Sequence, residues 1–138
     1  MSELPQNTSA SEIAISSSLK NACWLNQPEP HAFERWHFDA LSDDGREALV
    51  ITFHDNFPLS PRYFRLQKNK NGESSVSSEK FPAVSLTYSI DGKVILRTVN
   101  ECRPDEFISS DDGVGCSIGT SSFRVDTASY GLFEARIA

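Results

Sequence analysis

Residues 34–54, Glu34-Arg-Trp-His-Phe-Asp-Ala-Leu-Ser-Asp-Asp-Gly-Arg-Glu-Ala-Leu-Val-Ile-Thr-Phe-His54, contain two strand-like runs on either side of an acidic turn. In the first run, apolar Trp36 and Phe38 alternate with polar His37 and Asp39. Because successive side chains of an extended strand point to opposite faces, this alternation predicts a half-buried strand. The Asp-Asp-Gly sequence that follows favours a tight reversal, since glycine accepts a positive φ without a Cβ clash. The stretch therefore predicts a β-hairpin.

Short β-rich runs separated by turn residues continue along the chain, which is the pattern of an antiparallel meander. We expect strands at Phe33–Leu41, Glu47–His54, Arg62–Lys68, Ala83–Ile90, Lys93–Val99, Glu106–Ser109, Gly115–Ile118 with Phe123–Val125, and Tyr130–Ile137. No segment has clear helical periodicity, so the sequence predicts an all-β protein. Residues 1–20 are rich in Ser and other polar residues and are expected to form a flexible leader. Residues 21–138 then form the β-domain.

The Asp91-Gly92 pair predicts a two-residue hairpin loop, which sets the register of the strands that it joins. The predicted pairs are Ile90 with Lys93, Tyr88 with Ile95, and Leu86 with Arg97. In that register one face of the hairpin is apolar apart from Arg97. Burial of an unpaired guanidinium is costly, so Arg97 is expected to find a carboxylate, with Glu101 and Asp39 as candidates, or to reach solvent.

Composition limits the kinds of partner that the protein can have. The chain has 138 residues, enough for one domain, and a net charge of −6 with its 13 Lys and Arg residues scattered along it. A scattered minority of basic residues argues against nucleic acid as a partner. No apolar run approaches the roughly 20 residues that cross a bilayer, and the first residues lack the pattern of a secretory signal. We therefore expect a cytoplasmic protein without membrane insertion.

Motifs for metal or cofactor binding are not recognisable in the sequence. The 3 cysteines, Cys23, Cys102 and Cys116, are too far apart for a metal-ligand pair or a redox motif. Asp111-Asp112-Gly113 lacks the further carboxylates of a calcium loop. No glycine-rich phosphate loop occurs. The expectation is a protein that uses neither a metal nor a cofactor.

Several motifs resemble those of a known family. The order Glu-Trp-Phe-Asp-Ala, then Asp-Gly and an apolar strand, as found in residues 34–54, resembles the opening hairpin of the carotenoid 1,2-hydratase-like lipocalins. This group includes fungal Diels-Alderases and kievitone hydratase. Phe81–Tyr88, Arg97–Glu101 and Ser122–Asp126 are similar to later strands of the family. The resemblance covers roughly residues 33–137, with Arg35 and His37 at positions where the family usually has Trp and Tyr.

The resemblance implies an antiparallel lipocalin-like (calycin) β-barrel. Members of the family usually carry two such domains that face each other, and this chain would supply the N-terminal one. We expect the barrel to be incomplete at the C-terminus, where the sequence ends inside a predicted strand. A homodimer or a second lipocalin-like domain would then be the protein partner.

By the same resemblance, the function would be cofactor-free handling of a hydrophobic small molecule. The first hypothesis is a Diels-Alderase-like cyclase that acts on a polyketide or terpenoid intermediate of secondary-metabolite biosynthesis. The second is a hydratase of a carotenoid or another alkene. The third is a carrier without enzymatic activity.

Three polar residues are candidates for catalysis: His37, Asp39 and Arg97. His37 and Asp39 lie two apart on one strand, so they share a face and could act as acid and base in hydration. His37 or Arg97 could donate a hydrogen bond in cyclisation. The expected substrate-binding residues are Trp36, Phe38, Tyr88 and Phe53.

A structural alternative assigns both patterns to ordinary packing. His37 and Asp39 would then lie on the solvated outer face, while Trp36 and Phe38 fill the core. His54 and Asp55, at the end of the second strand, could form a second acid/base pair, but in the structural alternative they lie at an exposed rim.

Overall fold

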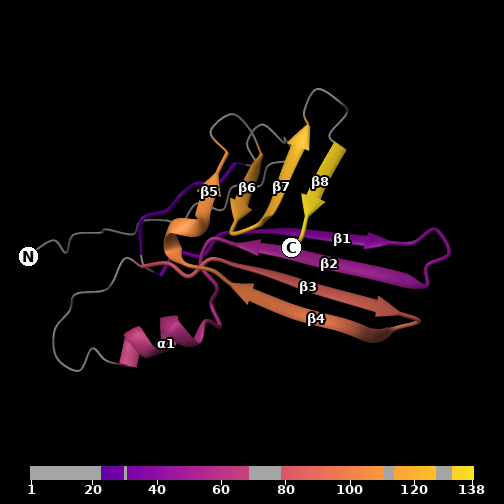
Figure 1. Ribbon diagram of the computed structural model, residues 1–138, viewed down its shortest axis with the longest axis horizontal. Helices are drawn as coiled ribbons and strands as arrows, with labels where there is room; N and C mark the ends of the chain where they lie inside the picture. The colour runs from indigo at the N-terminus through magenta and orange to yellow at the C-terminus, as the bar shows by residue number, and fades with distance from the viewer. Residues whose placement is uncertain (1–22, 30, 69–78, 111–113, 127–131) are drawn as a thin grey trace, which may run out of the picture.

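The computed structural model of the chain describes residues 23–29, 31–68, 79–110, 114–126 and 132–138. Within these residues the chain forms two four-stranded antiparallel sheets, an α-helix and a short 3-10 helix (Figure 1). The predicted leader at 1–20, the turn at 111–113 and the start of the last predicted strand at Tyr130 lie outside the described residues. The prediction of an all-β, antiparallel protein is confirmed at the level of the sheets.

The first sheet has the order β1-β2-β3-β4, formed by Arg35–Leu41, Glu47–His54, Ala83–Ile90 and Lys93–Glu101. The predicted hairpin is present, with Trp36 opposite Phe53 and Phe38 opposite Ile51. Gly45 has a φ of 70°, the left-handed conformation for which glycine is suited. The bounds predicted for β2 and β3 agree with the structure.

The predicted strand at Arg62–Lys68 is wrong, because this segment is the helix α1, Pro61–Lys68. The Ser60 Oγ accepts a hydrogen bond from the Tyr63 backbone N at 3.2 Å, which satisfies one free N–H of the first turn. Proline at the first helical position costs nothing, since its missing N–H would have no partner there. The Ser-Pro pair was therefore a helix-start signal that the interpretation as a strand overlooked.

A one-residue irregularity also corrects the predicted register of the β3–β4 hairpin. Ile90 lies opposite Lys93 as predicted, but the register shifts between Tyr88 and Ser89, where β4 contains one extra residue. Beyond this bulge Tyr88 pairs with Leu96, and Arg97 pairs with Thr87. A shift of one residue turns each side chain to the other face. Arg97 is therefore exposed on the face opposite to the one predicted.

The second sheet has the order β5-β6-β7-β8 and follows the 3-10 helix η2, Pro104–Glu106. Its strands are Phe107–Ser109, Gly115–Ile118, Ser121–Asp126 and Leu132–Arg136. These strands fall within the segments predicted to be β, except that Glu106 belongs to η2 and that Ser121, Ser122 and Asp126 extend β7.

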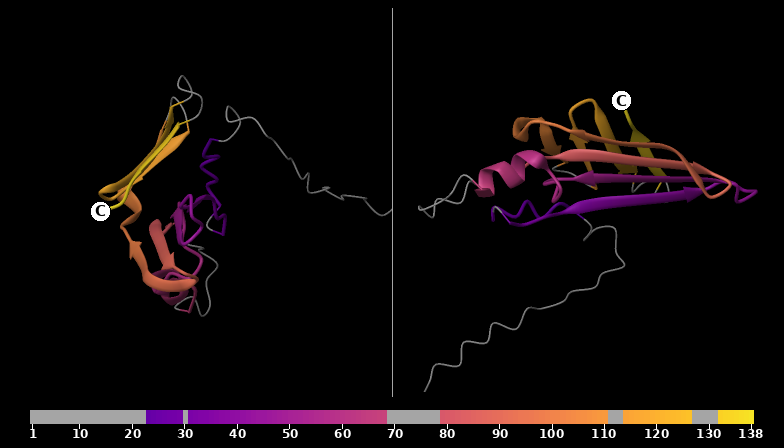
Figure 2. Two further views of the ribbon diagram at one scale, coloured as in Figure 1. Left: turned by 90° about the vertical axis from the view of Figure 1, so that its right-hand side faces the viewer. Right: turned by 90° about the horizontal axis from the view of Figure 1, so that it is seen from below.

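The two sheets meet at an angle (Figure 2). Buried side chains from both sheets fill the space between them at one end of the first sheet. The far ends of β1–β4, near the turns at 42–46 and 91–92, extend beyond the second sheet (Figures 1 and 2). In the described part of the chain, strand pairing links β1 to β4 and β5 to β8 but does not join the sheets into a closed barrel.

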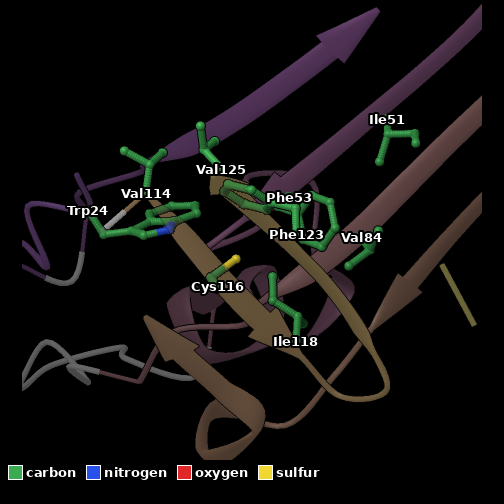
Figure 3. Close-up of a cluster of buried hydrophobic side chains, with 9 residues drawn as sticks. All are labelled: Trp24, Ile51, Phe53, Val84, Val114, Cys116, Ile118, Phe123 and Val125. Atoms are coloured by element: carbon green, nitrogen blue, oxygen red, sulfur yellow. The ribbon is translucent and has the colours of Figure 1, made fainter. Parts of the chain in front are cut away.

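The buried core gathers side chains from both sheets and from the segment before β1 (Figure 3). It comprises Trp24, Ile51, Phe53, Val84, Val114, Cys116, Ile118, Phe123 and Val125. Phe53 is fully buried and Phe123 is 3% exposed. Full burial of such an aromatic side chain contributes about 1.5–3 kcal/mol, so this cluster is what holds the two sheets together.

Candidate ligand-binding groove

Aromatic rings form the central wall between the two sheets. Phe123 of β7 contacts Trp36, Phe38 and Phe53, with ring centroids 5.3, 4.9 and 4.8 Å apart. Trp36 and Phe38 stack on each other along β1 at 6.1 Å with an interplanar angle of 19°. Three of the four predicted substrate-binding residues therefore lie together, and the sequence did not indicate that Phe123 joins them.

An open groove of about 420 Å³ continues from this wall between β1, β2 and β8. Its apolar lining consists of Phe38, Ala40, Leu49, Ile51 and Ala135. His37 and Asp39 also border the groove, although strand alternation directs their side chains toward the other face of the sheet. The groove therefore presents mainly hydrocarbon to a guest.

The same face of the first sheet carries apolar residues beyond the groove. Leu86 lies opposite Ile51, and Tyr88 lies opposite Leu49 on one side and Leu96 on the other. Tyr88 is thus on the face where the prediction placed it. Its hydroxyl donates a hydrogen bond to Glu47 Oε1 at 2.5 Å, and this bond raises the pKa of Tyr88. Leu96 is 50% exposed, so the second sheet does not cover this end.

The three predicted catalytic side chains lie on the opposite face of the first sheet. His37 pairs with Thr52, and its Nδ1 is 3.0 Å from Thr52 Oγ1. His37 and Asp39 are both exposed and share a face, as predicted. This exposure, and the packing of partly buried Trp36 and Phe38 against the core, agree with the placement that the structural alternative predicts.

Arg97 does not meet the carboxylates proposed for it. Asp39 and Arg97 stand in one cross-strand row but are separated by Val50 and Thr87, which is three strand spacings or about 14 Å. The other candidate partner, Glu101, pairs with Arg62 at 2.6 Å. The arrangement therefore does not bring acid, base and guanidinium to one point.

His54 and Asp55 are buried rather than exposed at a rim, which corrects the prediction. Burial and the nearby Arg35 charge lower the pKa of His54 to about 4. Asp55 is 3% exposed, pairs with Lys80 at 2.5 Å, and accepts a hydrogen bond from the Glu34 backbone N at 2.7 Å. A buried carboxylate needs such partners. These residues fix the end of β2 to the segment before β3, a structural role that the exposed-rim interpretation missed.

The cysteines are free thiols in three different environments. Cys23 is exposed, Cys102 is partly buried, and burial raises the pKa of Cys116 to about 12. A thiol with so high a pKa is a poor nucleophile. The described residues contain no group of three or more His, Cys, Asp or Glu side chains that could hold a metal ion.

The fold and the groove together define an antiparallel, all-β protein with an open apolar groove between two sheets. No family model, curated protein sequence or solved structure matches the chain. Among the described helices, none has the length and apolar character needed to cross a membrane.

Proposed function

We propose that this protein binds a hydrophobic small molecule along the groove between the first sheet and β8, and that it acts as a carrier. The observation that supports the proposal is the separation of the two faces of the first sheet. Phe38, Leu49, Ile51 and Leu86 lie on one face, and the other face carries His37, Asp39 and Arg97 together with aliphatic Val50. Apolar pockets of a few hundred Å³ are the usual size for small-molecule sites.

The proposal includes a lipocalin-like architecture in which the two sheets are the walls of a calyx. Support comes from the antiparallel order β1 to β4 followed by β5 to β8, with the apolar faces turned toward each other. A second lipocalin-like domain or a second copy would complete the open end of the first sheet. The exposed apolar side chain of Leu96 at that end favours such a cover.

Cyclisation of a flexible polyene is a second candidate function that uses the same groove. Phe38, whose ring stacks on that of Trp36, contributes an aromatic surface to the groove, and holding reacting ends together can lower a barrier by several kcal/mol. Hydration has less support, because it requires an acid and a base at the alkene. The side chains of His37 and Asp39 are directed away from the groove.

Titration with N-phenyl-1-naphthylamine, a neutral dye that fluoresces in apolar sites, tests the binding function. Leu49 and Val50 are neighbours on β2 whose side chains lie on opposite faces. Leu49→Asn should weaken dye binding about tenfold, because a polar amide is then desolvated by the guest, while Val50→Asn should leave it nearly unchanged. Equal effects of the two substitutions would contradict binding in the groove.

Liquid chromatography coupled to mass spectrometry of a candidate polyene, before and after incubation with the protein, separates a carrier from an enzyme, because an isomer of the same mass elutes at a different time. A carrier returns the polyene unchanged. A gain of one water that disappears in Asp39→Asn would instead support hydration, and an isomer of unchanged mass that persists in Asp39→Asn would support cyclisation.

A further inference from the structure

A second hollow lies near α1 and shares no lining residue with the groove. It has a volume of about 460 Å³ and is formed by α1, the segment before β3 and the segment after β4. Leu66, Phe81 and Pro104 give it apolar lining, and three guanidinium groups, from Arg62, Arg65 and Arg103, stand around it.

The three guanidinium groups differ in the ion pairs that they form within the chain. Arg62 pairs with Glu101 at 2.6 Å, and its guanidinium carbon is 5.9 Å from the centroid of the Phe81 ring. Arg103 is 3.5 Å from carboxylate oxygens of both Asp105 and Glu106. These contacts keep Arg62 and Arg103 close to carboxylates of their own chain.

Arg65 is the guanidinium that remains available to a guest. Its Nε donates to the Pro61 carbonyl O at 3.4 Å, which orients the group, and it forms no ion pair with the residues that the structure describes. A planar guanidinium can bind a carboxylate through two parallel hydrogen bonds. Leu66, the next residue of α1, places hydrocarbon beside that charge.

We propose that this hollow binds a carboxylate carried on an apolar body, with Arg65 holding the carboxylate and Leu66, Phe81 and Pro104 contacting the hydrocarbon. The site is separate from the groove of the proposed function and does not depend on it. Glu79 and Asp105 also line the hollow, so their negative charges oppose the ligand and limit the affinity.

Two dyes with one skeleton test this site. 1-Anilinonaphthalene-8-sulfonate is anionic, whereas N-phenyl-1-naphthylamine lacks the sulfonate. Arg65→Gln should raise the Kd for the anionic dye about tenfold and leave that for the neutral dye unchanged, since a charge-assisted hydrogen bond contributes at least that factor. Glu79→Gln should tighten binding of the anionic dye. Decanoate should displace that dye, and decanol should not.

Arg97→Gln is the matched control, because Arg97 is an exposed arginine on a different surface. The proposal is overturned if Arg65→Gln and Arg97→Gln change the affinity equally, or if decanol competes as well as decanoate. It is also overturned if Leu49→Asn raises the Kd for the anionic dye and Arg65→Gln does not, since that result places the dye in the groove. If the wild-type protein binds the anionic dye but not the neutral dye, the result counts against the groove of the proposed function and not against the site at Arg65.

Discussion

The two ends of the first sheet have similar strands but different surroundings. At the covered end, Phe53 and Val84 face each other and are 0% and 3% exposed under the second sheet. At the open end, Tyr88 and Leu96 face each other on the same side of the sheet, and Leu96 is 50% exposed. The alternation that orients the side chains is therefore common to both ends. What differs is whether the second sheet covers these side chains, and this decides which end stabilises the fold and which end leaves apolar side chains exposed.

The largest effect is expected at the centre of the covered end. Phe123→Ala removes a ring that contacts Trp36, Phe38 and Phe53, and should lower the free energy of unfolding by about 3–5 kcal/mol. Urea denaturation followed by tryptophan fluorescence measures it. Ser122→Ala, at the next position on β7, is the control and should change the value by less than about 1 kcal/mol. A loss below that value for Phe123→Ala would mean that the sheets do not depend on this cluster.

Acidification should destabilise the covered end through His54. Because the pKa of His54 is lowered to about 4 in the folded state, the unfolded chain binds its proton first as the pH falls below about 6.5. Stability from this group is therefore present above pH 6.5 and lost between pH 6.5 and 4, amounting to about 2 kcal/mol between pH 7 and pH 5.

Denaturation of the wild type and of His54→Gln at the two pH values checks this assignment. The variant should lose that part of the pH dependence, whatever its stability at pH 7. An unchanged pH dependence would show that other groups are responsible.

The helix that begins beside the covered end should depend on its cap. Ser60→Ala removes the hydroxyl that accepts the Tyr63 N–H, at an expected cost of about 1 kcal/mol. The neighbouring Leu59 is 68% exposed, so Leu59→Ala should have little effect. Thermal denaturation of both variants tests the difference, and a larger loss for Leu59→Ala would place the stabilising contact outside the cap.

The smallest effect is expected at the open end. Leu96→Ala should change stability by no more than about 0.5 kcal/mol, whereas Ile118→Ala, at a position 1% exposed, should cost about 2–5 kcal/mol. Urea denaturation of the two variants compares the ends directly. A cost above 1 kcal/mol for Leu96→Ala would indicate that another part of the protein or a second copy covers this end in solution.

The sequence was sufficient where local geometry decides the structure. The Asp-Gly turns and the alternation of Trp36, Phe38 and their neighbours predicted the first sheet, with the faces of His37 and Asp39 correctly assigned. It was insufficient where one residue changes the pattern or where distant segments meet. A β-bulge has no sequence signal as strong as that of a turn, so the sheet face predicted for Arg97 was wrong. The position of Phe123 against β1 and β2 follows from the packing of two sheets that are far apart in the chain.

The bulge in the β3–β4 hairpin gives β4 one spare residue. Ser89 lies opposite Val94 and Tyr88 opposite Leu96, so Ile95 has no counterpart on β3. Removal of Ile95 would make the pairing of β3 with β4 continuous. The side chains of Leu96 and of every later residue of β4 would stay on the same faces of the sheet. Removal of a residue beyond Leu96 would instead reverse the rest of the strand. The hairpin can thus change length by one residue at a single place while its inner surface keeps the same chemical character.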